Sequence, residues 1–326
     1  MLRRLISLGT IASLILSAYA LAPKAVEIAE ILGFRNDPAR VLLYRLSGLD
    51  KPAYEREIAE ALKREDPELA RSLADLARDQ GIGIDGATLD RITAAGQFSI
   101  TRSTRQLLAG AVTGEADSPT AFAGALAADL TVVGDVRDLT QQALAYPEQD
   151  NLTVALAATG VILTGATALT VGTSTAGKVG VSAIKAARKM KRLSKGLERQ
   201  LVRLASDAID ARILRTMSRE LGNWNFRAAA DSTRRLIKPR VVDEIAETGG
   251  ALSHVFNKQG YRGTLQVLEI ADDTADIRKL GRVSDSLGTR FRGALQLKRG
   301  GRLTLRIAEI AFAFLWWISA MVGWLV

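Results

Sequence analysis

The sequence predicts an all-α fold, in the form of a helical multi-pass membrane protein with two extramembrane helical domains. Three observations lead to this prediction. Apolar residues recur at helical spacing, the alternation typical of strands does not persist anywhere, and three long segments carry no charge. Hydrophobic residues make up 48% of the chain and prolines number only 7, which argues against a disordered chain.

The composition removes several classes of chemistry. The chain has no cysteine and a single histidine, His254, so disulfides, thiolate metal sites and a cysteine nucleophile are excluded. Ser253 precedes His254 directly, and two adjacent residues cannot by themselves form a nucleophile and its base. Asp272, Asp273 and Asp276 could bind a cation, but they also suit the start of a helix. We therefore predict no catalytic residue, no metal site and no cofactor.

Residues 1–23 begin with two positive residues and continue as the first uncharged segment of the chain. Arg3 and Arg4 precede an apolar stretch from Leu5 to Pro23 that contains a small-residue site at Ala18 and Ala20. This arrangement is typical of a signal peptide, and its length also suits an uncleaved signal anchor. Both interpretations remain open.

Residues 24–150 are predicted to form an acidic helical domain on the outward, periplasmic side. From Pro23 to Asp150 there are 14 basic and 21 acidic residues. Asp66 suits the N-cap of a helix with Pro67 in its first turn, which should end near Gly81.

Residues 151–177 are predicted to be a Gly/Ala-rich transmembrane segment, because they carry no charge. Gly160, Gly165 and Gly172 would allow close helix packing of the kind seen in membranes. The alternative is a helical hairpin buried in a soluble domain, although soluble helices seldom run this far without a charge.

The same region contains the spacing of a phosphate-binding loop. Gly172, Gly177 and Lys178 match the pattern, but Val179 stands where a hydroxyl should bind Mg²⁺. We therefore interpret Lys178 as the cytoplasmic end of the second span.

A basic run follows the second span. Its six cations are predicted to contact anionic lipid along a helix at the headgroups, and the alternative is a solvated helix face. The residues are Lys185, Arg188, Lys189, Lys191, Arg192 and Lys195.

Residues 178–306 are predicted to form a basic helical cytoplasmic domain, and residues 307–326 a C-terminal transmembrane helix. From Asn151 onward there are 28 basic and 14 acidic residues. Because basic loops stay in the cytoplasm, this asymmetry predicts an acidic outer half and a basic inner half, in a multi-pass protein of the bacterial inner membrane.

Two stretches resemble known proteins. "VVGDVRDLTQQA", the Ala/Gly/Thr-rich stretch and "AARKMKRLSKGL" resemble the GD-[VI]-RD pre-toxin region of polymorphic toxins, over residues 129–193. They also resemble a group of uncharacterised proteobacterial membrane proteins, to which "LEIADDTADIRKLGRVSDSLGTRFRGALQL" is similar as well. The resemblance implies a helical membrane protein and supplies no catalytic residue.

The sequence thus predicts a non-enzymatic structural or scaffold component of an envelope assembly. Two alternatives remain: a toxin-related pore built from the second span, and a membrane-bound hydrolase using the region near His254. The expected partners are membrane lipids and other membrane proteins or further copies of the chain, and nucleic acid is not among them because no recognition module or aromatic stacking platform is visible.

Overall fold

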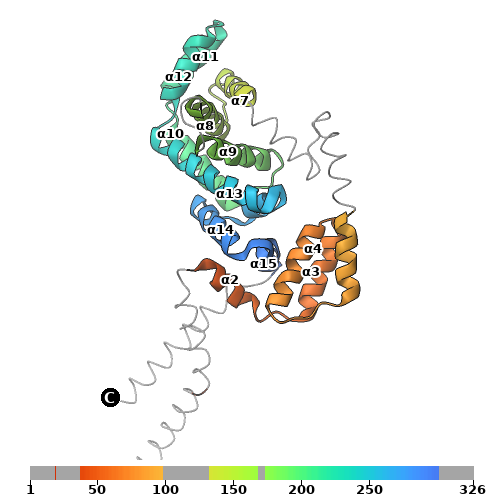
Figure 1. The fold of residues 1–326 in the computed structure, drawn as a ribbon. Helices are drawn as coiled ribbons and strands as arrows, with labels where there is room; N and C mark the ends of the chain where they lie inside the picture. Colours follow the sequence, from red (N-terminus) through yellow and green to blue (C-terminus); the bar gives the residue numbers. More distant parts are fainter. Residues whose placement is uncertain (1–18, 20–36, 98–131, 168–172, 301–326) are drawn as a thin grey trace, which may run out of the picture.

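The computed structural model describes residues 37–97, 132–167 and 173–300, together with Tyr19. In these ranges every regular element is a helix, apart from one β-bridge between Ile209 and Ile237. The helices (Figure 1) are α2 (Pro38–Leu46), α3 (Lys51–Lys63), α4 (Pro67–Asp79), residues 86–97, α7 (Val132–Leu144), α8 (Asn151–Thr167), α9 (Thr173–Lys189), α10 (Lys195–Ala208), α11 (Ala211–Gly222), α12 (Phe226–Leu236), α13 (Pro239–Ile270), α14 (Thr274–Leu287), the short η1 (Gly288–Arg290) and α15 (Phe291–Gly300). The prediction of helices throughout is confirmed in these ranges.

Short polar side chains begin many of these helices. Asp66 accepts a hydrogen bond from the backbone N–H of Leu69 and Pro67 occupies the first turn of α4, so the predicted helix start is confirmed. Asp37, Asp50, Asp210 and Asp273 cap their helices in the same way.

The predicted second span is instead a buried helical hairpin. Helix α8 ends at Thr167 and α9 begins at Thr173. At 1.5 Å per residue the 17 residues of α8 extend for only about 26 Å, less than the hydrocarbon core of a bilayer. Val154, Ala155 and Ala157 are 0% exposed, because α7, α9, α10, α12 and α13 surround α8. A helix enclosed by protein needs no charge on any face, which is why this segment resembles a membrane span.

No helix within the described ranges combines the length and the apolar character that crossing a lipid bilayer demands. The predictions of a multi-pass membrane protein and of an inner-membrane location are therefore wrong. The predicted signal segment, residues 1–23, and the predicted C-terminal transmembrane helix, residues 307–326, lie outside the described residues. Lys178 does not mark the end of a span, because its side chain is buried inside the helical body.

The acidic and basic halves of the chain contact each other, so the sidedness inferred from their charges is also wrong. Arg292 of α15 donates two hydrogen bonds to Asp66, at 3.0 and 2.6 Å, and Arg262 of α13 lies 3.0 Å from the same carboxylate. The hydroxyl of Ser72 accepts a hydrogen bond from the backbone of Gly293. The opposite charges of the two halves thus attract each other directly within one body.

The electrostatics of Asp66 follow from this position. Burial alone would raise the pKa of Asp66, but the hydrogen bond and charge of Arg292 and the charge of Arg262 outweigh burial and hold it below its ordinary value. Replacing Asp66 with asparagine keeps a capping oxygen but removes the negative charge beside Arg292, which is buried. We expect Asp66→Asn to cost about 2 kcal/mol of folding free energy.

Hydrogen exchange should locate this loss. Amides of α2 to α4 should exchange faster in Asp66→Asn than in the parent chain, because these helices lose a contact to α15. Asp75→Asn is the matched control, since its partner Arg78 is largely exposed. Equal exchange in the two variants would contradict this account.

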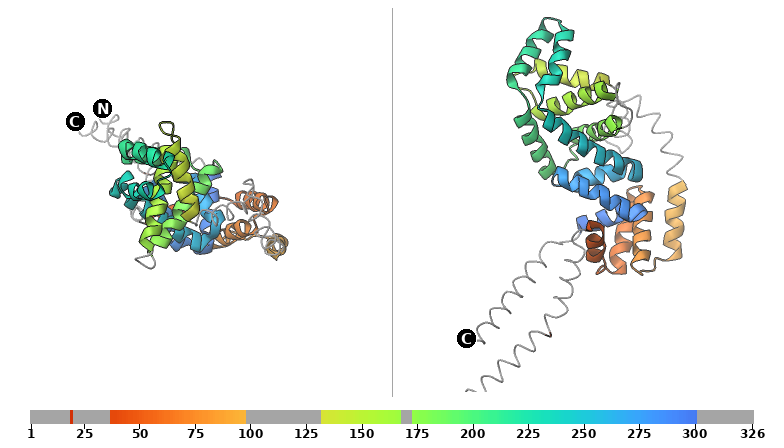
Figure 2. Two further views of the ribbon diagram at one scale, coloured as in Figure 1. Left: turned by 90° about the horizontal axis from the view of Figure 1, so that it is seen from above. Right: turned by 60° about the vertical axis from the view of Figure 1, so that its left-hand side comes forward.

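The helical body is elongated. In Figure 1 the α11–α12 hairpin lies at one end, and α3, α4 and residues 86–97 lie at the other. The second view in Figure 2 shows the same separation. Helix α13 runs between these ends and changes direction at Gly260, whose φ of 67° is outside the helical region. The two ends of the body are therefore available to different contacts.

Candidate functional site

A buried network of charges joins α7 to α9. The ammonium of Lys185 lies 2.8 Å from Asp135 and 2.9 Å from Asp138, and all three residues are at most 6% exposed. Lys178, about two turns earlier on the same face of α9, donates a hydrogen bond of 2.6 Å to Thr164 of α8 and lies 3.9 Å from Asp135. These aspartates are the two acidic residues of the "GDVRD" stretch, so this motif acts here as the acidic half of an internal ion-pair network.

The network lowers the pKa of Asp138. Burial raises the pKa of Asp138, but the hydrogen bond and charge of Lys185 and the charge of Lys189 outweigh it, so the pKa lies below its ordinary value. Burial acts in the same direction on Asp150, where hydrogen bonds from Arg188 and Thr153 again lower the pKa. Ionised, paired carboxylates of this kind hold helices together and are poor proton acceptors.

The six cations of the basic run lie in different surroundings from those expected for a lipid-binding helix face. Lys185 is buried in the network, Arg188 binds Asp150, and Arg192 binds Glu269. Lys189 is exposed with its ammonium 4.0 Å from Asp138. Lys191 and Lys195 are exposed.

A cavity of about 340 Å³ beside the network brings four of these cations together. Its lining also includes acidic residues, so the cavity is not a purely basic site. The lining residues are Asp138, Thr153, Leu156, Lys185, Arg188, Lys189, Lys191 and Glu198. Asp138 and Asp150 pair with Lys185 and Arg188, so Lys189 and Lys191 are the exposed cations of this lining.

The structure bears differently on each of the three glycines that were predicted to pack helices. A Cβ on Gly160 would lie 2.3 Å from the carboxylate of Asp135, so Gly160 makes room for the buried network on α7. Gly165 lies in α8, and Gly172 lies outside the described residues. The closest helix crossing uses other glycines: a Cβ on Gly180 of α9 would lie 1.9 Å from the carbonyl oxygen of Gly249 on α13.

The structure also shows the surroundings of the other residues that the sequence suggested as site candidates. Ser253 is buried, whereas His254 is exposed and hydrogen bonds Asp285 at 2.6 Å, so the two adjacent residues face different surroundings. Asp273 caps α14 by accepting a hydrogen bond from Asp276. In the described ranges no group of three acidic or histidine side chains has the arrangement of a metal site.

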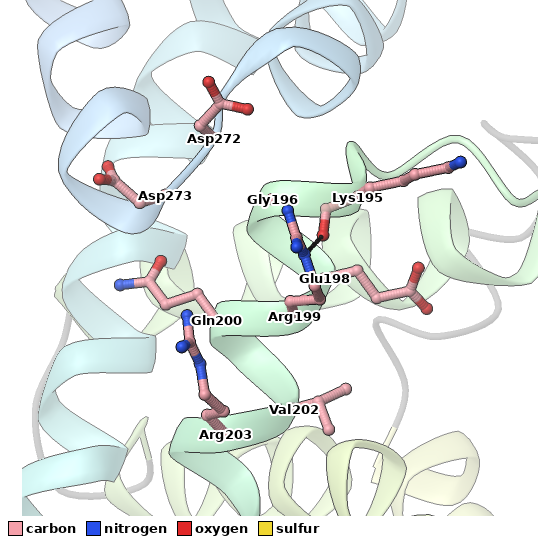
Figure 3. Close-up of a pocket in the computed structure, with 9 residues that line it drawn as sticks. All are labelled: Lys195, Gly196, Glu198, Arg199, Gln200, Val202, Arg203, Asp272 and Asp273. Carbon is pink, nitrogen blue, oxygen red and sulfur yellow. Dashed lines mark hydrogen bonds between the residues drawn. The ribbon is translucent and has the colours of Figure 1, made fainter.

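A broad groove of about 1170 Å³ runs along α10 (Figure 3). Lys195, Arg199 and Arg203 recur at every fourth position of α10 and therefore share one helix face. Asp272 and Asp273 lie across from them on the connection between α13 and α14. Gly196 allows the two sides to meet, since a Cβ there would lie 2.8 Å from the Asp272 carbonyl oxygen.

The charges of this groove are open to an external partner. Arg199 and Arg203 are exposed, and no ion pair joins either of them to an acidic side chain in the part of the chain that the structure describes. Val202, between them on α10, is 37% exposed. The groove therefore combines a basic stripe, an acidic edge and an apolar contact point.

Reasoning from sequence missed Arg199 and Arg203 as site residues. Their spacing was visible in "KGLERQLVR", but nothing local indicates which exposed stripe lies beside the acidic edge at Asp272. Residues 195–203 and 272–273 meet because Ser194 donates a hydrogen bond from its backbone to Leu268 at the end of α13. Gln200 of α10 also accepts a hydrogen bond of 2.8 Å from the backbone of Thr274, so the groove is identified by long-range contacts and not by any local pattern.

Comparison with known proteins adds no relative: no family model, no curated protein and no solved structure matches this chain.

Proposed function

We propose that this chain is a non-enzymatic scaffold that binds a charged helical segment of another protein in the groove along α10. The supporting observation is the groove itself, with three cations at every fourth position facing an acidic edge. The proposal involves binding through complementary charges and no catalytic step, because the buried charges of the body already form internal ion pairs.

The expected partner follows from this pattern. A partner helix with acidic residues at every fourth position would meet Lys195, Arg199 and Arg203 in turn. A basic residue on its other side would meet Asp272, and an apolar residue would cover Val202. Opposite charges along both edges also favour one orientation of the bound helix over the reverse.

Photo-crosslinking from Val202 tests the proposal. A photoreactive amino acid at Val202 should capture one partner protein in cells, and the captured protein can be identified by mass spectrometry. Arg199→Glu with Arg203→Glu should reduce this product at least tenfold, because two attractive contacts become repulsive. Both arginines are exposed, so the double variant should remain folded.

Two further arms complete this test. Arg56→Glu with Lys279→Glu makes the same change in total charge at exposed sites outside the groove lining, and it should leave the product unchanged. The identified partner should also regain binding to the double variant when its own acidic residues are changed to lysine. A product that survives the groove reversal, or falls equally in the control, would rule the proposal out.

A further inference from the structure

The α11–α12 hairpin concentrates positive charge at one end of the body. Residues 211–236 contain six arginines and only two acidic residues. On α11, Arg212, Arg215 and Arg219 are exposed along one face, while Leu214 and Met217 are buried on the opposite face. The turn between the two helices carries Trp224, which is 80% exposed. Figure 1 shows this hairpin at the end of the body far from α3 and α4.

Trp224 occupies a conformation that its side chain disfavours. Its φ of 58° lies in the left-handed region, where glycine is at ease and a bulky residue is strained. This conformation closes the end of α11, because the backbone N–H of Trp224 donates to Leu221 and that of Asn225 donates to Glu220. The turn leaves most of the surface of Trp224 exposed and so open to a contact outside the chain.

The other end of the body carries a matching pocket. An opening of about 380 Å³ lies between α4 and the helix of residues 86–97, with Pro67, Ile92 and Gly96 in its wall. This volume is near the lower limit of ordinary ligand pockets, about 300 Å³, and therefore suits one large side chain. Glu68, whose side chain is 75% exposed, and Arg71 also line the pocket, so the acidic excess belongs to the whole of residues 37–97.

The two ends have opposite charge. Residues 37–97 contain 12 acidic and 9 basic residues, whereas the hairpin carries the excess of arginines described above. Trp and Arg are also the residue types that contribute most at protein interfaces.

We propose that Trp224 of one copy inserts into the Pro67–Ile92 pocket of a second copy, with the hairpin arginines meeting the acidic end that surrounds it. The pocket and the hairpin lie at opposite ends of the body, so one chain cannot satisfy its own contact (Figures 1 and 2). Different surfaces meet in this interface, and such head-to-tail contacts extend into rows of subunits unless they close into a ring.

This inference extends the proposed scaffold function, since repeated copies would present the α10 groove at regular intervals. It uses none of the groove residues. The two proposals can therefore fail separately: groove variants should leave self-assembly intact, and hairpin variants should leave the Val202 product intact.

Introduced cysteines provide the main test, because the chain has none of its own. Asn223→Cys places a thiol beside Trp224, and Thr93→Cys places one at the pocket, both at exposed positions. In the purified full chain, the double variant should form a ladder of disulfide-linked multimers under oxidising conditions. Each single variant should remain mostly monomeric, because head-to-tail contact never brings two identical positions together.

Trp224→Gly then tests the inserted side chain. Added to the double-cysteine chain, it should reduce the ladder at least tenfold while leaving the melting temperature equal or higher, since glycine relieves the backbone strain. Val136→Ala, which truncates another exposed apolar side chain, is the matched control and should leave the ladder unchanged. Ile92→Trp should block the pocket and also remove the ladder.

Three results would overturn the proposal. The first is a ladder that persists in Trp224→Gly, and the second is dimerisation of either single variant as readily as of the double variant. The third is that Asn223→Cys in cells crosslinks only to a different protein, which would assign the hairpin to a foreign acidic partner.

Discussion

Replacing Lys185 with methionine should lower the free energy of unfolding by about 4 kcal/mol, because it removes one side of a buried ion pair. Lys185 is 4% exposed, and Asp135 and Asp138 beside it are 1% and 6% exposed. Without the ammonium, two carboxylates remain buried near each other, opposed only by the largely exposed Arg137 and by the more distant Lys178 and Lys189. Urea denaturation at pH 7 measures the loss.

The pH dependence of this variant should have the opposite sign to that of the parent chain. In the parent, Lys185 holds the pKa of Asp138 below its ordinary value despite burial, so the stabilisation is complete above about pH 4 and is lost as the pH falls through the lowered pKa. In Lys185→Met, burial acts without this cation and raises the pKa of Asp138. The folded variant then binds protons more tightly than the unfolded chain, and its deficit should shrink as the pH falls from 7 to 5.

A double variant separates charge from packing. Lys185→Met with Asp138→Asn removes one cation and one carboxylate and leaves Asp135 beside the buried Lys178, so it should regain much of the lost stability. If the double variant were less stable than Lys185→Met at pH 7, the charges would not be the source of the loss.

Adding one methyl group at Gly180 should cost about 3 kcal/mol, because the new Cβ would meet backbone. That Cβ would lie 1.9 Å from the carbonyl oxygen of Gly249, and a Cβ on Gly249 would lie 2.3 Å from the carbonyl oxygen of Gly177. Backbone cannot turn aside as a flexible side chain can, so α9 and α13 must separate along their shared contact. Thermal unfolding of Gly180→Ala and Gly249→Ala should show a lower melting temperature in both.

The adjacent glycine provides the control. A Cβ on Gly250 meets nothing within 4 Å, and Gly250 lies in the same helix. Gly250→Ala should therefore raise stability by up to about 1 kcal/mol through helix propensity alone. Equal effects of Gly249→Ala and Gly250→Ala would show that α9 and α13 do not cross as closely as described.

Local sequence signals predicted the helices well because helix starts and helix faces depend on neighbouring residues. Asp66 and Pro67 begin α4 as expected, and the helix ends at Asp79, close to the expected end near Gly81. These features need only interactions within a few residues.

The segment of residues 151–177 shows where local reasoning stops. An uncharged run has the same composition whether lipid or protein surrounds it, and only the arrangement of the other helices distinguishes the two. Here α7 and α9 cover α8, and Gly177 and Gly180 pack against α13 instead of against a second membrane helix. Of the glycines predicted to pack helices, Gly160 makes room for Asp135 of α7, whereas the close approach to α13 uses Gly177 and Gly180, which were not predicted.

The candidate site was less predictable than the helices. Lys195 and Asp272 were singled out from sequence for separate reasons, and nothing local indicated that they line one groove. Lys185 was assigned to lipid because consecutive cations resemble a solvated surface, whereas its acidic partners on α7 precede it by about fifty residues. The exposure of Trp224 likewise depends on a turn whose position at the end of the body is a property of the whole fold.

The amino-acid sequence by itself determined that the described part of this chain is helical, where several of its helices begin, and that its two halves carry opposite charge. The tertiary structure alone decided what those charges do: Asp66 binds Arg292, and Asp135 and Asp138 bind Lys185, inside one body. The physical reason is how far apart in the sequence the interacting groups lie. Capping and helix periodicity act between neighbours along the chain, whereas the energy of a charge depends on which distant groups replace the water around it.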